Sequence, residues 1–230
     1  MDWNLLLEEA RKSFYTEFFN ELGGILVVIA YVYKKEKTIA QSVLTTIAIA
    51  SLAQLLTYQL YTLQWFPFPF GKQILKFSIY TYILIEAICC LTYLKINIRS
   101  NGIKKMIWLC RLLFSAYIIL TAGLLNTGIF QFHTEITEAF LIIGFCLYFF
   151  YESLQKTDKL SFFQPCSWAI LGMLTLFGST LPLFVFLGYF KSNASNFKYS
   201  LFAINHVAYF LLFIAFTIAI VYDKTAKQSQ

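Results

Sequence analysis

The sequence predicts an all-α, polytopic membrane protein, a bundle of seven transmembrane helices. Three observations support this fold class: the composition, the length of the apolar runs, and the distribution of basic residues. The chain has 230 residues, of which 59% are hydrophobic and only 13% are charged. That is too little polar surface to cover a water-soluble protein of this size. The charges cluster between apolar runs, and each run is about as long as the 20 residues that a helix needs to cross a bilayer.

Seven apolar segments define the predicted elements, all within a single domain that covers residues 1–230. We predict spans at residues 15–33, 39–62, 73–94, 106–126, 136–154, 167–189 and 200–222. Each run is continuously apolar and lacks the alternation typical of a transmembrane β-barrel strand. Residues 1–14 place apolar side chains on one helical face, which predicts a helix lying in the membrane interface. The first span contains Glu17, Asn20 and Glu21, and the alternative is a helix that only partly crosses the membrane.

The basic residues predict the orientation of the bundle. If the N-terminus lies outside and the C-terminus in the cytoplasm, 12 of the 18 Lys and Arg residues face the inner side. These are Lys34, Lys35, Lys37, Lys95, Arg99, Lys104, Lys105, Arg111, Lys156, Lys159, Lys224 and Lys227. Cytoplasmic loops are enriched in basic residues, so we expect an N-out, C-in, multi-pass protein of the bacterial inner membrane. The net charge of +6 is therefore interpreted as an orientation signal and not as a sign of nucleic-acid binding.

Several kinds of chemistry have no signature in the sequence. The five cysteines show no CxxC spacing, and the chain has no HExxH, GxSxG or Walker motif. A retinal protein would need a lysine in the last span, and residues 200–222 contain none. We therefore expect no cofactor, no metal site and no enzymatic activity.

Glu86 is the ionisable residue predicted to lie deepest in the membrane. It sits near the middle of the third span, one helical turn after Tyr82. A carboxyl group at this depth is costly and is a functional candidate for that reason. Apolar surroundings favour its protonated form, which can donate a hydrogen bond or relay a proton. The alternative is a neutral Glu that holds two helices together by a hydrogen bond.

A second group of polar residues is predicted in the outer half of the bundle. The first, second and seventh spans bring these side chains to similar depth: Glu17, Asn20, Glu21, Gln54, Tyr58, Asn205 and His206. They are predicted to line a ligand pocket that opens to the outside, to which Tyr82 and Glu86 would add a deeper part. The alternative is that the acids lie among the lipid head groups and the other residues form ordinary hydrogen bonds between helices.

The last third of the chain resembles a group of known proteins. Pro165 and Trp168 open the sixth span, Gly172 lies within it, and Asn205 lies early in the seventh. This pattern is similar to that of small, uncharacterised bacterial seven-helix membrane proteins, which are often encoded beside histidine kinases. The resemblance implies a membrane sensor with a histidine kinase or another membrane signalling protein as its partner, and it implies no catalytic residue.

Two functions are therefore predicted from the sequence. The first is a membrane receptor or accessory sensor that binds a small or lipid-like ligand in the outer-half pocket and signals to a partner. The second is a proton-coupled small-molecule transporter or channel that uses Glu86. An intramembrane enzyme acting on lipid is disfavoured, because no nucleophile, base and metal occur together in the sequence.

Overall fold

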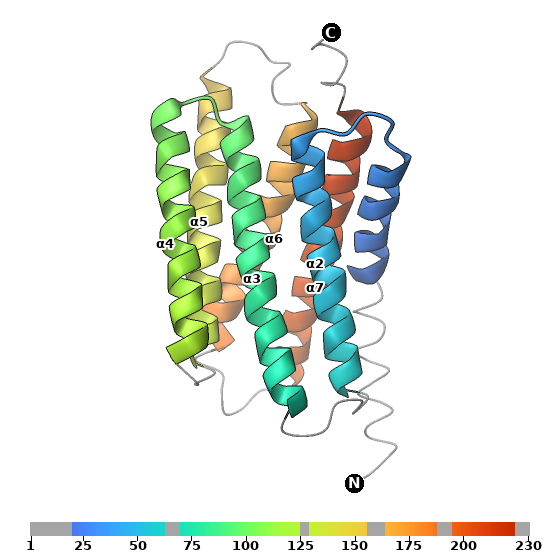
Figure 1. Cartoon of the computed structure of the whole chain (residues 1–230), viewed down its shortest axis with the longest axis vertical. Coiled ribbons are helices and arrows are strands. Elements are labelled where there is room, and N and C mark those ends of the chain that lie inside the picture. Colours follow the sequence, from blue (N-terminus) through green and yellow to red (C-terminus); the bar gives the residue numbers. More distant parts are fainter. Residues whose placement is uncertain (1–19, 63–69, 125–128, 156–163, 188–194, 224–230) are drawn as a thin grey trace.

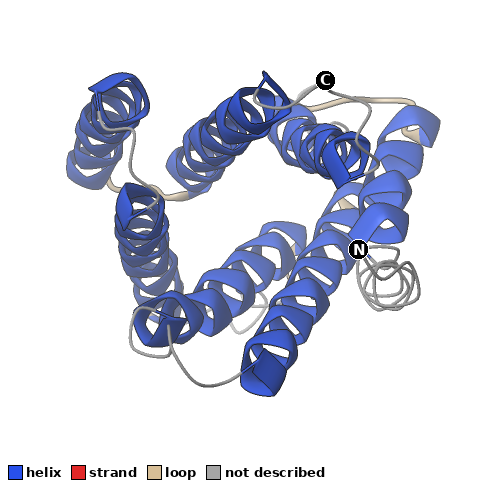
Figure 2. Ribbon diagram, turned by 90° about the horizontal axis from the view of Figure 1, so that it is seen from below, coloured by secondary structure: helices blue, strands red, loops and turns tan. Residues whose placement is uncertain are grey.

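The structure is a computed structural model that describes residues 20–62, 70–124, 129–155, 164–187 and 195–223. These residues form helices and no strand (Figures 1 and 2). The first helix is Asn20–Tyr33. It is followed by α2 (Ile39–Thr62), α3 (Phe70–Asn97), α4 (Asn101–Leu124), α5 (Ile129–Leu154), α6 (Pro165–Leu187) and α7 (Ser195–Tyr222). The all-α prediction is confirmed, whereas the interfacial helix predicted at 1–14 lies outside the described residues.

Five helices in the described part of the chain are long and apolar enough to cross a membrane. Their apolar segments are Ile39–Tyr61, Gln73–Asn97, His133–Leu154, Pro165–Leu183 and Ile204–Tyr222. The helix Asn20–Tyr33 is shorter, and α4 contains Lys104, Lys105 and Arg111. Length and composition therefore identify a helical membrane protein.

Consecutive helices run in opposite directions and stand side by side (Figures 1 and 2). α6 packs against α5 and α7, and α3 packs against α2, α4 and α5. Their inner faces form a core of fully buried side chains, including Leu44, Leu91, Ile142, Ile170 and Phe216. Large apolar side chains such as Phe77, which is 73% exposed, lie on the outer faces. This distribution of apolar residues suits contact with lipid.

A glycine allows α6 and α7 to approach closely. A Cβ atom added at Gly172 would lie only 2.8 Å from the Cβ of Ala215. At Gly144, in contrast, an added Cβ would meet no atom within 4 Å. Small residues at a helix contact increase van der Waals packing, which is a main source of helix association in membranes. Gly172 and Ala215 therefore explain the tight α6–α7 contact.

One end of the bundle collects most of the basic residues in the described part of the chain. We call it the basic end and define it by Lys34, Lys35, Lys37, Lys95, Arg99, Lys104 and Lys105. It is the upper end in Figure 1, where the first helix ends, α2 begins, α3 ends, α4 begins and α7 ends.

Hydrogen bonds tie three helices together at the basic end. The Thr38 hydroxyl accepts a hydrogen bond from the backbone N–H of Gln41 (3.2 Å), and the Gln41 side chain accepts one from the N–H of Thr38 (3.0 Å). This reciprocal pair is a capping box at the start of α2. Gln41 Nε2 also donates to Asp223 Oδ2 (3.0 Å), and Lys34 Nζ donates to the backbone carbonyl of Val221 (2.9 Å). The end of α7 is thus held between the first helix and α2.

The helices extend further than the apolar runs predicted. α2 has the predicted bounds, but α3 begins at Phe70 and not at 73, and α5 begins at Ile129 and not at 136. Backbone hydrogen bonding continues through polar residues at a helix end, whereas hydropathy reports only the apolar part. The earlier start of α5 brings Glu135 into the helix.

Candidate functional site

Glu86 lies in the interior of the bundle and is hydrogen-bonded to a tyrosine on its own helix. Its side chain is 3% exposed. The Tyr82 hydroxyl donates to Glu86 Oε1 over 2.8 Å, and it is also hydrogen-bonded to the Tyr209 hydroxyl on α7 over 3.2 Å. Residues four apart on a helix share a face, which explains why Tyr82 can reach Glu86. Tyr209 was not predicted as a site residue, because the contact between α3 and α7 cannot be read from either segment alone.

A second buried carboxyl, Glu138 on α5, lies close to Glu86. Glu138 is 3% exposed, and it lies near enough to Glu86 for ionisation of the one to disfavour ionisation of the other. Glu138 Oε1 is buried and has no hydrogen-bond partner in the structure described here. Glu138 was not predicted as a site residue, although it lies within the predicted span 136–154. It is interior because its side chain is on the inner face of α5.

The sequence does contain a signal for Glu138. Thr134, Glu138 and Ile142 are spaced four residues apart and are exposed by 0%, 3% and 0% respectively. Such spacing defines one face of a helix. The predicted span 136–154 already contains Glu138 and Ile142, so helical spacing alone places these two residues on one face.

The surroundings of the two carboxyls are acidic and apolar. The other charged group that acts on both Glu86 and Glu138 is Glu135, also on α5. Within the described ranges, neither carboxyl forms an ion pair with a basic residue. An ionised carboxylate is expensive to bury without a partner, and two adjacent ones repel each other. This arrangement favours a proton on at least one of the two carboxyls.

Two polar contacts lie nearer the end of the bundle opposite the basic end. Asn20 Nδ2 donates to His206 Nδ1 over 2.6 Å, which joins the first helix to α7. With Nδ1 as the acceptor, the proton of a neutral His206 ring is on Nε2. Gln59 Nε2 on α2 donates to Glu21 Oε1 on the first helix. Gln59 was also not predicted as a site residue.

Only some of the predicted site residues contact one another in the described part of the chain. Asn205 is half-buried, and its Oδ1, like Asn20 Oδ1, is buried without a hydrogen-bond partner in the described structure. Gln54 is half-buried and Tyr58 is exposed. Glu17 lies outside the described residues. Asn20 thus meets His206, and Tyr82 meets Glu86, while no hydrogen bond between described residues joins Gln54 to either pair.

No metal site is present in the part of the chain that the structure describes, since no three His, Cys, Asp or Glu side chains gather there. The five cysteines, all within the described ranges, are free. Comparisons of the chain with protein-family models, with curated proteins and with solved structures found no match. The functional interpretation therefore depends on the geometry of the carboxyl pair and of the polar contacts around it.

Proposed function

We propose that the protein is a proton-coupled transporter of a small molecule in the bacterial inner membrane, and that Glu86 and Glu138 bind the coupling proton. The observation that supports this is a pair of carboxyls, each 3% exposed, on two apolar helices that are long enough to span a membrane. Because two neighbouring carboxylates in an apolar interior cannot both be ionised at low cost, one of them holds a proton. Intramembrane carboxyls of this kind mark proton relays in pumps and transporters.

Tyr82 and Tyr209 provide the first part of a path for the proton, and His206 lies beyond them towards the end opposite the basic end. The Tyr82 hydroxyl contacts both Glu86 and Tyr209. His206 precedes Tyr209 by three residues on α7, and so the two share a helix face. A tyrosine hydroxyl both donates and accepts a hydrogen bond, and a histidine ring can do the same. The Tyr82 and Tyr209 hydroxyls can therefore relay a proton to or from Glu86, and His206 lies one helical turn from Tyr209 on α7.

Transport can be tested with the purified protein in lipid vesicles that contain a pH-sensitive dye. Pools of amino acids, sugars, organic acids and amines are added outside, with the outer solution more acidic than the lumen. We expect at least one pool to acidify the lumen faster than in protein-free vesicles, because substrate and proton enter together. The proposal is rejected if no pool does so, or if uptake of the active compound is unchanged when the pH gradient is removed.

A receptor or accessory sensor is the second candidate function, and one observation favours it. Two buried acceptor atoms, Asn20 Oδ1 and Asn205 Oδ1, are without partners in the described structure. Asn20 is hydrogen-bonded to His206 through its Nδ2, and Asn205 precedes His206 in the sequence. They can accept hydrogen bonds from the N–H or O–H groups of a small or lipid-like ligand. Its signal would pass to a histidine kinase or another membrane partner. A compound that raises the melting temperature of the protein without changing the vesicle pH would favour this function over transport.

We further propose that all seven helices span the membrane, with the N-terminus outside and the C-terminus in the cytoplasm. The alternating helix directions support this topology (Figure 1), and the excess of Lys and Arg marks the basic end as cytoplasmic. Glu36 and Gln73 are both exposed and lie near opposite ends of the bundle. They are therefore suitable positions for single introduced cysteines.

Thiol labelling of intact cells tests the topology. We expect a membrane-impermeant thiol reagent to label Gln73→Cys in intact cells and to label Glu36→Cys only after the membrane is opened. The parent chain, with its five native cysteines, gives the background signal. Labelling of Glu36→Cys in intact cells would reverse the orientation, and labelling of both positions would rule out the alternating arrangement.

A further inference from the structure

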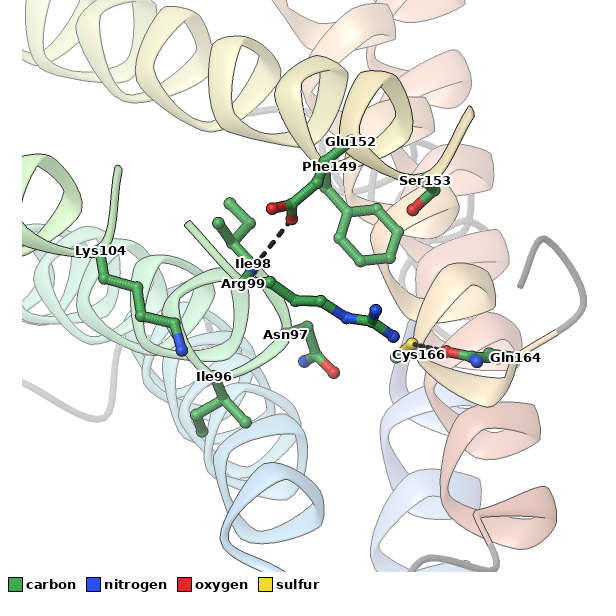
Figure 3. A pocket seen from close by; sticks show the side chains of 10 residues that line it. All are labelled: Ile96, Asn97, Ile98, Arg99, Lys104, Phe149, Glu152, Ser153, Gln164 and Cys166. Atoms are coloured by element: carbon green, nitrogen blue, oxygen red, sulfur yellow. Dashed lines mark hydrogen bonds between the residues drawn. The ribbon is translucent and has the colours of Figure 1, made fainter. Parts of the chain in front are cut away.

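A cavity lies at the basic end, between the ends of α3, α4, α5 and α6 (Figure 3). Its volume is about 220 Å³, which is several times the roughly 30 Å³ that one water molecule occupies in the liquid. Its polar lining includes Asn97, Arg99, Lys104, Glu152 and Gln164. The carboxyl pair and the predicted outer-half pocket do not contribute to it, so it is a separate feature of the molecule.

The cavity has an excess of positive charge. The Arg99 side chain extends towards Gln164 and Cys166 at the start of α6, and Lys104 is on the first turn of α4 (Figure 3). Neither cation forms an ion pair with another described residue. The carboxylate that lines the cavity, Glu152, is already engaged, because its two oxygens accept hydrogen bonds from the backbone N–H groups of Arg99 (2.9 Å) and Ser100 (3.1 Å). Two cations therefore remain available to an anion.

The position of the cavity along the bundle indicates where such an anion would come from. The apolar segments of α3, α5 and α6 end or begin at Asn97, Leu154 and Pro165, and the cavity is lined by residues at these same ends. In a bilayer, this level corresponds to the lipid head groups. Arg forms bidentate hydrogen bonds with phosphate, and Lys contributes a point charge. The amides of Asn97 and Gln164 supply further hydrogen-bond donors.

We propose that this cavity binds a phosphate group, held by Arg99 and Lys104, that belongs either to an anionic phospholipid or to a soluble phosphate compound. The proposal does not depend on the transport function, because its residues lie at the basic end and are not those of the carboxyl pair. Each basic residue near an anionic membrane surface contributes roughly 1 kcal/mol to binding, so removing either one should weaken binding by about fivefold.

Two binding experiments with the full chain distinguish the sources of the phosphate. In the first, native mass spectrometry compares retention of phosphatidylglycerol and phosphatidylcholine by protein in detergent that contains equal amounts of both. In the second, equilibrium dialysis measures binding of radiolabelled inorganic phosphate to protein in phosphatidylcholine nanodiscs. We expect saturable binding in at least one experiment, reduced about fivefold in Arg99→Gln and again in Lys104→Gln.

Lys105→Gln is the matched control, since Lys105 is an exposed neighbour on α4 that does not line the cavity. It should bind like the unchanged protein in both experiments. Circular dichroism and gel filtration confirm that each variant is folded. The unchanged protein tests by itself whether a phosphate group binds at all. If binding is seen in the first experiment and not in the second, the ligand is a phospholipid. Binding in the second experiment identifies a soluble phosphate. The proposal is wrong if the unchanged protein binds in neither, or if Lys105→Gln weakens binding as much as the two cavity variants.

Discussion

The double variant Glu86→Gln, Glu138→Gln is expected to lose the infrared C=O stretching band of a buried, protonated carboxyl that the unchanged protein shows at neutral pH. Both side chains are 3% exposed, and no cation pairs with them among the described residues. Burying an ionised carboxylate under such conditions costs so much that the group is neutral instead. Glutamine has the shape of the protonated carboxyl, and its amide does not titrate, so the variant should keep its fold while the band disappears completely.

The single variants assign the proton within the pair. Whichever of Glu86→Gln and Glu138→Gln removes most of the band identifies the carboxyl that holds the proton. Glu36→Gln is the matched control, because Glu36 is exposed and should leave the band unchanged. A band that persists at full intensity in the double variant would show that the proton is held elsewhere, and the carboxyl pair would then lose its proposed role in transport.

The fold could largely be predicted because its strongest signal is local. Continuous apolar runs placed helices correctly, and α2 was predicted with its observed bounds of 39 and 62. Errors arose at helix ends, where polar residues continue the helix. The first seven residues of α5, from Ile129 to Glu135, were assigned to a loop. Hydropathy measures how well a segment suits lipid, and it does not report where backbone hydrogen bonding stops.

The candidate site could be predicted only where its residues lie on one helix. Tyr82 and Glu86 are one turn apart, and their proximity follows from helical spacing. The partners from other helices, Tyr209, Glu138 and Gln59, were missed because a single sequence does not show how each helix is rotated or which neighbour it meets. The cavity around Arg99 was missed for the same reason, because it forms where four helix ends meet.

Phe213→Ala is expected to lower the free energy of unfolding by about 3–5 kcal/mol. Phe213 is 0% exposed, its ring lies 6.3 Å from those of Tyr209 and Phe216, and its Cβ would lie 3.0 Å from a Cβ at Gly23. Removing the ring leaves a cavity that the rigid helices cannot close. In lipid the unfolded chain also keeps its apolar side chains out of water, so lost packing accounts for most of the cost.

Phe77→Ala is the matched control for this loss of packing. It removes the same ring from α3, where the side chain is 73% exposed, and it should cost less than about 1 kcal/mol. Unfolding in a titration with denaturing detergent, followed by circular dichroism, gives both values. Equal small costs would mean that the first helix is not firmly packed on α7. The Asn20–His206 contact joins this same pair of helices. Equal small costs would therefore also argue against that contact and against the receptor alternative, whereas a much larger cost for Phe213→Ala would support both.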